Sequence, residues 1–392
     1  MTALTLPERL RDVEGSPTLA LAAKAKALAN AGKPVLDFTA GEPDFPTPDP
    51  VKRAGIRAIE SNQTRYTPVA GLPELRAAVA QQVNRTRHTN YSAAHVLVSC
   101  GAKHALFNVF QALCQPGDEV ILLSPYWVSF PALVRLAGAK PVIVPTQEAD
   151  GFQPDLAAIR NAISGATKAL VINSPSNPTG AVVSKARLEA LAALALERHL
   201  VVISDEIYDE LVYPPAAHRS ITQLNPQMAD CTVLIGGVSK TYSMTGWRIG
   251  WAVGPEPLVE AMTTLQSHST SNPTSISQHA ALAALTGEQS SVAAMRKEFL
   301  ARRDRLVQGL AALPGLRVKT PEGAFYAWCN VRGLGQSAQA TAQQWLDEAL
   351  VATVPGEGFG SSEHIRFSFA TSLQTIDDAL RRLDSWCRKR SS

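Results

Sequence analysis

The sequence has no long apolar run and no marked excess of charge of either sign. No stretch approaches the ~18 consecutive apolar residues that a membrane-spanning helix needs. Its 37 basic and 34 acidic residues leave a net charge of +3, which does not suggest nucleic acid or a membrane surface as partner. The N-terminus lacks the pattern of a secretory signal and carries acidic residues, which transit peptides avoid. We therefore expect a cytoplasmic protein that acts on small molecules.

Cysteine is also scarce. The five cysteines are widely spaced and include no Cys-x-x-Cys pair. An odd number with this spacing favours reduced thiols over a disulfide framework or a zinc site. We expect no metal centre.

What the sequence does have is an alternation of strand-like and helix-like segments. Short runs rich in Val, Ile and Leu predict buried strands at 95–100, 119–124, 141–145, 168–173, 200–205 and 232–237. Apolar periodicity predicts helices at 18–31, 73–85, 184–198, 278–286, 292–312 and 375–390. This alternation predicts an α/β fold, with a mostly parallel central sheet flanked by helices.

The patterning changes near the C-terminus, which predicts a second domain. Two alternating strands with a helix between them are expected from 318–331 to 363–370. The segment before the proline-rich "GEPDFPTPDP" is too short for a domain of its own. The predicted division is an N-terminal segment that packs with the small domain, a large domain and a small α+β domain, at 1–46, 47–282 and 283–392.

Polar residues follow most of the predicted strands. In open parallel sheets ligands bind at the carboxyl ends of the strands, so these residues should converge at one edge. Residues 101–103, Gly-Ala-Lys, open a helix and could offer backbone N–H groups to a phosphate. An ordinary strand-to-helix turn would give the same sequence. Arg248 has the permanent charge and fork geometry that suit a phosphate. Arg366, in the alternating stretch 364–370, could grip a carboxylate or be an edge-strand charge.

Two further residues suggest the chemistry. Lys240 lies among small residues near Arg248, where poor hydration would lower its pKa and favour the free amine that forms a Schiff base. A surface lysine fits the local sequence equally well. Asp205 follows five largely apolar residues, so it is either a buried carboxylate with a cationic partner or a helix N-cap. An amine for an aldehyde, an acid for a ring nitrogen and a phosphate site together describe a pocket for pyridoxal 5′-phosphate (PLP).

At this point the sequence resembles a known family over nearly its whole length. It is similar to the class I aminotransferases of PLP fold type I, and most closely to the bacterial 1-beta aspartate aminotransferases. The resemblance rests on these segments, in order: "AGEPDFPTP", "RYTPVAGLPELR", "GAKHALFNVFQALCQPGDEVILLSPYWVSFP", "VINSPSNPTGAV", "SDEIYDELVY", "SKTYSMTGWRIGWAVGP", "PEGAFYAW" and "IRFSFATS".

The resemblance implies a role for each matching residue. Lys240 would bind the PLP aldehyde and shuttle the proton, and Asp205 would pair with the ring nitrogen. Tyr208 and Asn177 would contact the ring 3′-oxygen. The other implied cofactor contacts are Gly101, Ala102, Lys103, Trp127, Ser239 and Arg248, with Tyr66 reaching the neighbouring subunit of a homodimer. Arg366 would hold the substrate α-carboxylate together with Gly41, and Trp127 and Asn177 would also contact the substrate.

Substrate choice depends on fewer residues. In the 1-beta subgroup a lysine at the place of Lys103 reaches the distal carboxylate of aspartate or glutamate, and Thr18 matches a threonine near the same pocket. We therefore predict ping-pong transamination between L-aspartate and 2-oxoglutarate.

Two positions depart from the family pattern. Gly237 stands where many relatives have a phosphate-binding serine. Glu14 stands where prephenate-accepting relatives tend to have a basic residue, so we expect little activity on prephenate.

Other activities stay open at this stage. The same fold supports aminotransferases for neutral or aromatic amino acids, and carbon–sulfur lyases that release pyruvate and ammonia. A catalytically idle scaffold is a further alternative. The family also has cis peptide bonds at strand ends, for which Ser124–Pro125 and Asn177–Pro178 are the candidates.

Overall fold

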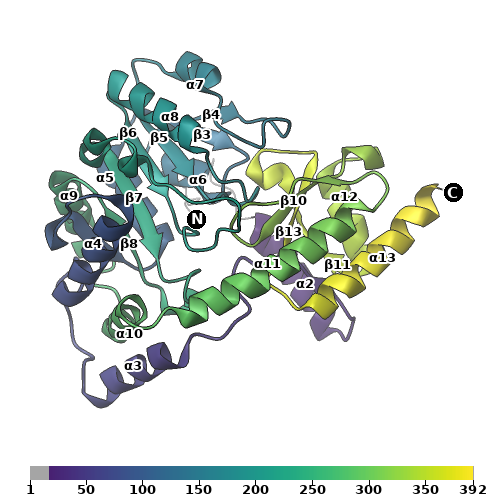
Figure 1. The fold of residues 1–392 in the computed structure, drawn as a ribbon, viewed down its shortest axis with the longest axis horizontal. Coiled ribbons are helices and arrows are strands. Elements are labelled where there is room, and N and C mark those ends of the chain that lie inside the picture. The colour runs from purple at the N-terminus through teal and green to yellow at the C-terminus, as the bar shows by residue number, and fades with distance from the viewer. Residues whose placement is uncertain (1–16, 392) are drawn as a thin grey trace, which may run out of the picture.

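A seven-stranded sheet forms the centre of the larger part of the molecule (Figure 1). The computed structural model describes residues 17–391. The strands lie in the order β2-β8-β7-β6-β5-β3-β4, and β8 runs antiparallel to both of its neighbours. Their bounds are β2 Val96–Ser99, β3 Glu119–Ser124, β4 Lys140–Pro145, β5 Thr167–Asn173, β6 Val201–Asp205, β7 Thr232–Gly237 and β8 Gly250–Val253. The six predicted strands are confirmed, and β8 was not predicted.

Helices cover both faces of this sheet because successive strand residues point to opposite sides. Val120 and Leu122 share a buried cluster with α5, α6 and α9, whereas Ile121 packs with α7 and α8. The helices α3, α4 and α10 cover the β2–β8 end. Their bounds are α3 Asp49–Glu60, α4 Pro73–Arg87, α5 Ala102–Leu113, α6 Ser129–Leu136, α7 Leu156–Ala162, α8 Lys185–Glu197, α9 Glu256–Ser267 and α10 Ser275–Thr286. Near-continuous apolar strands are thus buried on both sides.

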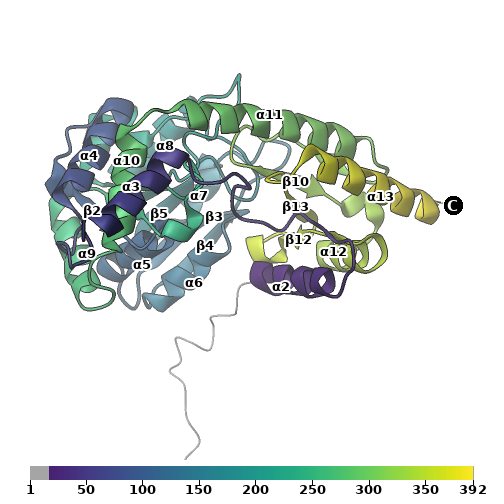
Figure 2. The same cartoon turned by 90° about the horizontal axis from the view of Figure 1, so that it is seen from below.

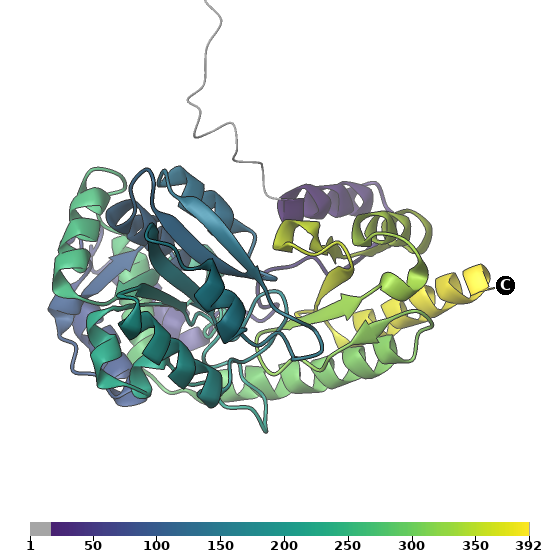
Figure 3. The ribbon, with the colours of Figure 1, turned by 90° about the horizontal axis from the view of Figure 1, so that it is seen from above.

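A second, antiparallel sheet of order β12-β13-β10-β9 lies beside the first. Figures 2 and 3 show it between α11 on one side and α2 on the other. The bounds of this part are α2 Pro17–Asn30, α11 Ser290–Ala311, β9 Arg317–Val318, β10 Tyr326–Asn330, α12 Ala338–Gln344, β12 Val354–Pro355, β13 His364–Ser368 and α13 Leu373–Ser391. The predicted strand–helix–strand pattern from 318 to 370 is therefore confirmed.

The start of the described chain packs against elements that lie next to the second sheet. β1 (Leu36–Asp37) pairs in parallel with β11 (Val351–Ala352), and Ala25 of α2 packs on Leu346. The division at 1–46, 47–282 and 283–392 stays a prediction. Since α10 continues to Thr286, a boundary at 282 would fall inside a helix.

Several local features bear on the sequence predictions. All six predicted helices are present, α5 opens at residues 101–103 as predicted, and α12 is the helix expected between the two C-terminal strands, whereas α3, α6, α7 and α9 were not predicted. The Ser124–Pro125 and Asn177–Pro178 bonds are both cis, as are two further X–Pro bonds. Among residues 17–391, no helix is both long and apolar enough to cross a membrane. The same residues hold no group of three or more His, Cys, Asp or Glu side chains placed to bind a metal.

Candidate active site

A cavity of about 730 Å³ opens at the carboxyl ends of β5, β6 and β7, between the two sheets. Most of the predicted site residues line it: Gly41, Ala102, Lys103, Trp127, Asn177, Asp205, Tyr208, Ser239, Lys240, Arg248 and Arg366. Gly101 packs against the Arg248 guanidinium. Tyr66 is 92% exposed and outside the cavity. Thr18 is in α2, but its side chain lies outside the described part of the chain, as does all of Glu14.

Lys240, three residues after β7, presents its amine to the cavity. The amine donates a hydrogen bond to the Gly41 carbonyl and lies near the Tyr208 ring. Burial lowers the Lys240 pKa to about 8, and the cations Arg366 and Arg248 act in the same direction. Two acids, Glu42 and Asp205, oppose the shift. The neutral amine that a nucleophile requires is therefore far more populated than in a lysine of ordinary pKa.

Asp205 ends β6 and is buried. Burial raises its pKa to about 7, against the effect of the Ile207 N–H, which donates to Oδ1 at 3.2 Å. A protonated ring nitrogen placed beside this carboxyl would favour its ionised form. The helix N-cap alternative is excluded, since no helix begins after β6 before residue 221.

An anion site forms where α5 begins. No side chain caps the α5 N-terminus, and Gly101 precedes it at φ +89°. A Cβ at Gly101 would lie 2.4 Å from Arg248 Nη2, so only glycine admits the guanidinium here. Arg248 is held in turn by the carbonyls of Thr245, at 2.8 Å, and Cys100, at 3.2 Å. A helix N-terminus and an adjacent guanidinium together suit a phosphate.

Arg366 lies on β13, an interior strand, so it is not an edge-strand charge. The side chain is buried and rigidly held. Nη1 donates to Asn177 Oδ1 at 3.0 Å and Nη2 to the Thr39 carbonyl at 2.9 Å, and the guanidinium stacks 4.4 Å from the Tyr326 ring centroid. Its Nε is buried with no hydrogen-bond partner among the described residues. A fixed cation with an unsatisfied N–H is suited to bind a carboxylate.

Lys103 supplies a second cation on the cavity wall. Its Nζ lies 5.0 Å from the centroid of the Trp127 ring, a distance typical of a cation–π contact. Burial lowers the Lys103 pKa, and Arg248 adds to that effect.

Several residues of this cavity were not predicted, among them Glu42, Asn173 and Tyr326. Glu42 accepts from Thr245 Oγ1 at 2.6 Å. Asn173 donates to the Asp205 carbonyl and accepts from the Asn177 N–H. The Tyr326 hydroxyl lies 3.0 Å from that of Tyr208. Only Asn173, the last residue of β5, could have been found from its place at a strand end.

The chemistry of the cavity suits an α/β enzyme that uses an amine as nucleophile next to two anion sites. The sequence model of the family "Aminotransferase class I and II" matches residues 33–383. The chain belongs to this family, which confirms the fold class and the family predicted from its motifs. Because class I aminotransferases use PLP, the predicted cofactor is confirmed as well.

Individual relatives cover nearly the whole chain. An aspartate aminotransferase from Bacillus subtilis is 44% identical over 99% of this chain and 100% of its own. An aspartate/prephenate aminotransferase from Thermus thermophilus is 45% identical over 96% and 97%. The solved structure of Thermus thermophilus aspartate aminotransferase with maleate has a TM-score of 0.94 and 43% identity over 97% of this chain and 99% of that one.

Proposed function

We propose that the protein transfers the amino group of L-aspartate to 2-oxoglutarate by a ping-pong mechanism. The observation that carries this proposal is the pair of cations, Arg366 and Lys103, on the wall of one cavity. Two cations suit a substrate with two carboxylates, because leaving one unpaired against a neutral substrate is costly. The relatives named as aspartate aminotransferases and the maleate of the Thermus structure, itself a dicarboxylate, support the same substrate class.

The residues of the cavity fit PLP. When bound, PLP supplies an aldehyde for the amine and a ring that withdraws electrons from the reacting carbon. In this proposal Lys240 Nζ moves the proton at the substrate Cα, and Asp205 holds the ring nitrogen in its protonated form. Arg248, Ser239 and the N-terminus of α5 hold the phosphate. Trp127 covers the ring, while Tyr208 and Asn177 contact its oxygen.

Lys103→Met tests the substrate class. We expect the rate of amino-group transfer from aspartate and glutamate to fall by about 10- to 100-fold, since a hydrogen bond to a charged group is lost, while the rate with alanine stays nearly unchanged. The measurement is the conversion of the bound cofactor's absorption by each amino acid without an oxo acid. Lys26→Met, which alters another lysine of the same cavity, is the matched control.

Other outcomes point to the alternatives. Equal loss with aspartate and alanine would contradict the dicarboxylate proposal and favour neutral or aromatic substrates. Release of pyruvate and ammonia without an acceptor would indicate the lyase. Prephenate belongs in the same series, because some relatives are named for it. We expect it to react slowly.

We also propose a homodimer in which Tyr66 reaches the phosphate bound by the partner subunit. Three apolar or aromatic side chains of one region support an interface: Tyr66 is 92% exposed, Ile56 52% and Ile59 55%. Ile56 and Ile59 lie on α3, directly before the Tyr66 loop.

Two measurements test the dimer. Sedimentation is expected to give twice the mass of the chain, and Tyr66→Phe is expected to weaken PLP retention several-fold. A monomer that retains PLP equally well with and without the Tyr66 hydroxyl would contradict the proposal. As a further proposal, the PLP-binding domain begins at residue 47, and its boundary with the small domain, predicted at 282, falls after α10 ends at Thr286. We also propose that the protein acts in the cytoplasm.

A further inference from the structure

A second acid follows Asp205 directly and points away from the active site. Glu206 is 4% exposed and lines a small separate hollow with Arg87 and Asp209, whereas Asp205 lines the large cavity. Opposite orientation of adjacent residues is what the alternation of an extended strand dictates. The sheet therefore carries one buried acid toward the cofactor site and the next toward its far face.

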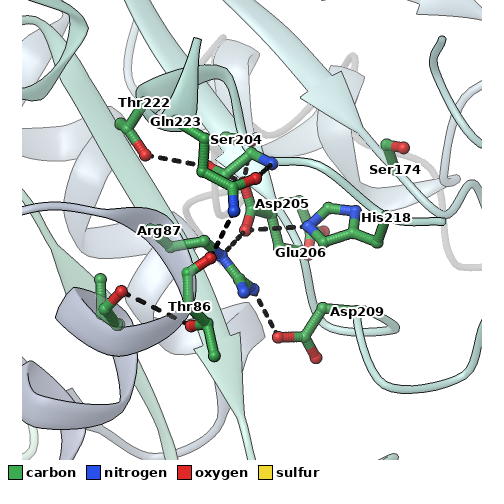
Figure 4. A network of polar contacts seen from close by, with 12 residues as sticks. Thr86, Arg87, Ser174, Ser204, Asp205, Glu206, Asp209, His218, Thr222 and Gln223 are labelled. Atoms are coloured by element: carbon green, nitrogen blue, oxygen red, sulfur yellow. Dashed lines mark hydrogen bonds and ion pairs between the residues drawn. The ribbon is translucent and has the colours of Figure 1, made fainter. Parts of the chain in front are cut away.

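Glu206 is held by four side chains (Figure 4). Oε2 accepts from Arg87 Nε at 2.7 Å and from His218 Nε2 at 3.2 Å. Oε1 accepts from the hydroxyls of Ser204, at 2.9 Å, and Ser220, at 2.6 Å. Because a carboxylate only accepts, His218 carries its proton on Nε2.

Arg87 connects this acid to the rest of the turn. It is the last residue of α4, and its side chain is 11% exposed. While Nε binds Glu206, Nη2 lies 2.5 Å from Asp209 Oδ2. The two ion pairs of Arg87 thus fix both ends of the turn 206–209. This turn contains Tyr208 and directly follows Asp205.

The charges of the turn affect Asp205. The negative charge of Glu206 raises the Asp205 pKa, in addition to the larger effect of burial. Arg87, followed by His218, lowers the pKa of Glu206 itself despite its burial. Without Arg87, Glu206 would either take up a proton and lose its contacts or stay charged with less compensation. The first result frees the turn from Arg87, and the second leaves a less compensated negative charge beside Asp205, which must be ionised to pair with a ring nitrogen.

We propose that Arg87 is a positioning residue for Asp205: through Glu206 and Asp209 it holds the turn that carries Asp205 and compensates the negative charge beside it. This inference rests on the proposed pairing of Asp205 with the ring nitrogen. Loss of such a residue weakens ligands that have that nitrogen more than ligands that lack it.

The test compares the affinity of the cofactor-free protein for PLP and for an analogue with carbon in place of the ring nitrogen. For Arg87→Gln we expect the preference for PLP over the analogue to fall about tenfold, which corresponds to one pKa unit at Asp205. Arg87→Lys, which keeps the charge, should restore most of it. Arg160→Gln breaks an exposed Arg–Glu pair instead and should leave the preference unchanged.

The results of this comparison distinguish a failure of the Arg87 inference from a failure of the proposed pairing of Asp205 with the ring nitrogen. Equal weakening of PLP and analogue in Arg87→Gln would mean a structural role only and overturn the inference. Glu206→Gln keeps an oxygen that accepts from Arg87 but removes the charge beside Asp205, so its preference for PLP should equal or exceed that of the parent. A fall there as large as in Arg87→Gln would also overturn it. A parent protein without any preference would show that Asp205 does not pair with the ring nitrogen, and both proposals would fail.

Discussion

Replacing Lys240 by alanine is expected to abolish transamination, with a loss on the order of 10⁴-fold or more, the upper range for a general acid–base group. The reason is positional as well as chemical. Burial and two nearby guanidinium groups lower the pKa of the Lys240 amine to about 8. Among the described side chains of the cavity, no other combines a lowered pKa with a place beside Asp205. The half-reaction with aspartate, followed by the absorption of the bound cofactor, measures the loss.

Covalent labelling provides a second readout for the same variant. Borohydride should fix PLP to the parent protein and leave it removable by dialysis from Lys240→Ala. Lys26→Ala is the control, because Lys26 lines the same cavity and should not alter the labelling. If Lys240→Ala were still labelled, another amine would be the nucleophile and the assignment of the site would be wrong.

The strands that position Lys240 and Asp205 could be predicted because they are short. A run such as "LVVIS" has no room for a helix and is buried on both faces, so its composition alone identifies it. β8 could not be found in this way, since "GWAV" begins with a glycine, a residue that strands disfavour. That glycine has a tertiary reason, because a Cβ at Gly250 would lie 2.2 Å from the Ala102 backbone nitrogen. Close approach of β8 to the start of α5 is invisible in the sequence.

The candidate site was predictable where it follows strand ends or matches a family motif. Asp205 and Lys240 were found by both routes, whereas Glu42 and Tyr326 lie within matched motif segments that gave them no role. Glu42 comes from a loop far away in sequence and is brought to the cavity by its bond with Thr245. Tyr326 lies within a buried strand, where an aromatic residue normally means core packing. Arg87 had no signal, because the last residue of a surface-like helix gave no hint of a buried acid across the fold.

Arg366 carries the second large expected effect. Arg366→Ala should lower kcat/KM for aspartate by roughly 100-fold or more, since removing one partner of a buried charge pair typically costs about 2–5 kcal/mol. Arg366→Lys should recover only part of this, because a point charge cannot reproduce the two-pronged contact of a guanidinium. Arg317→Ala, on the exposed end of the same sheet, is the matched control.

A substrate without an α-carboxylate distinguishes binding from folding. If the Arg366 guanidinium grips that carboxylate from the cavity wall, a simple primary amine should react with the Arg366→Ala variant and the parent at similar rates. A parallel loss with aspartate and with the amine would instead mean that the Asn177 and Thr39 contacts of Arg366 mainly hold the two sheets together. The ratio of the two rates therefore measures how much of the guanidinium's contribution is recognition of the substrate.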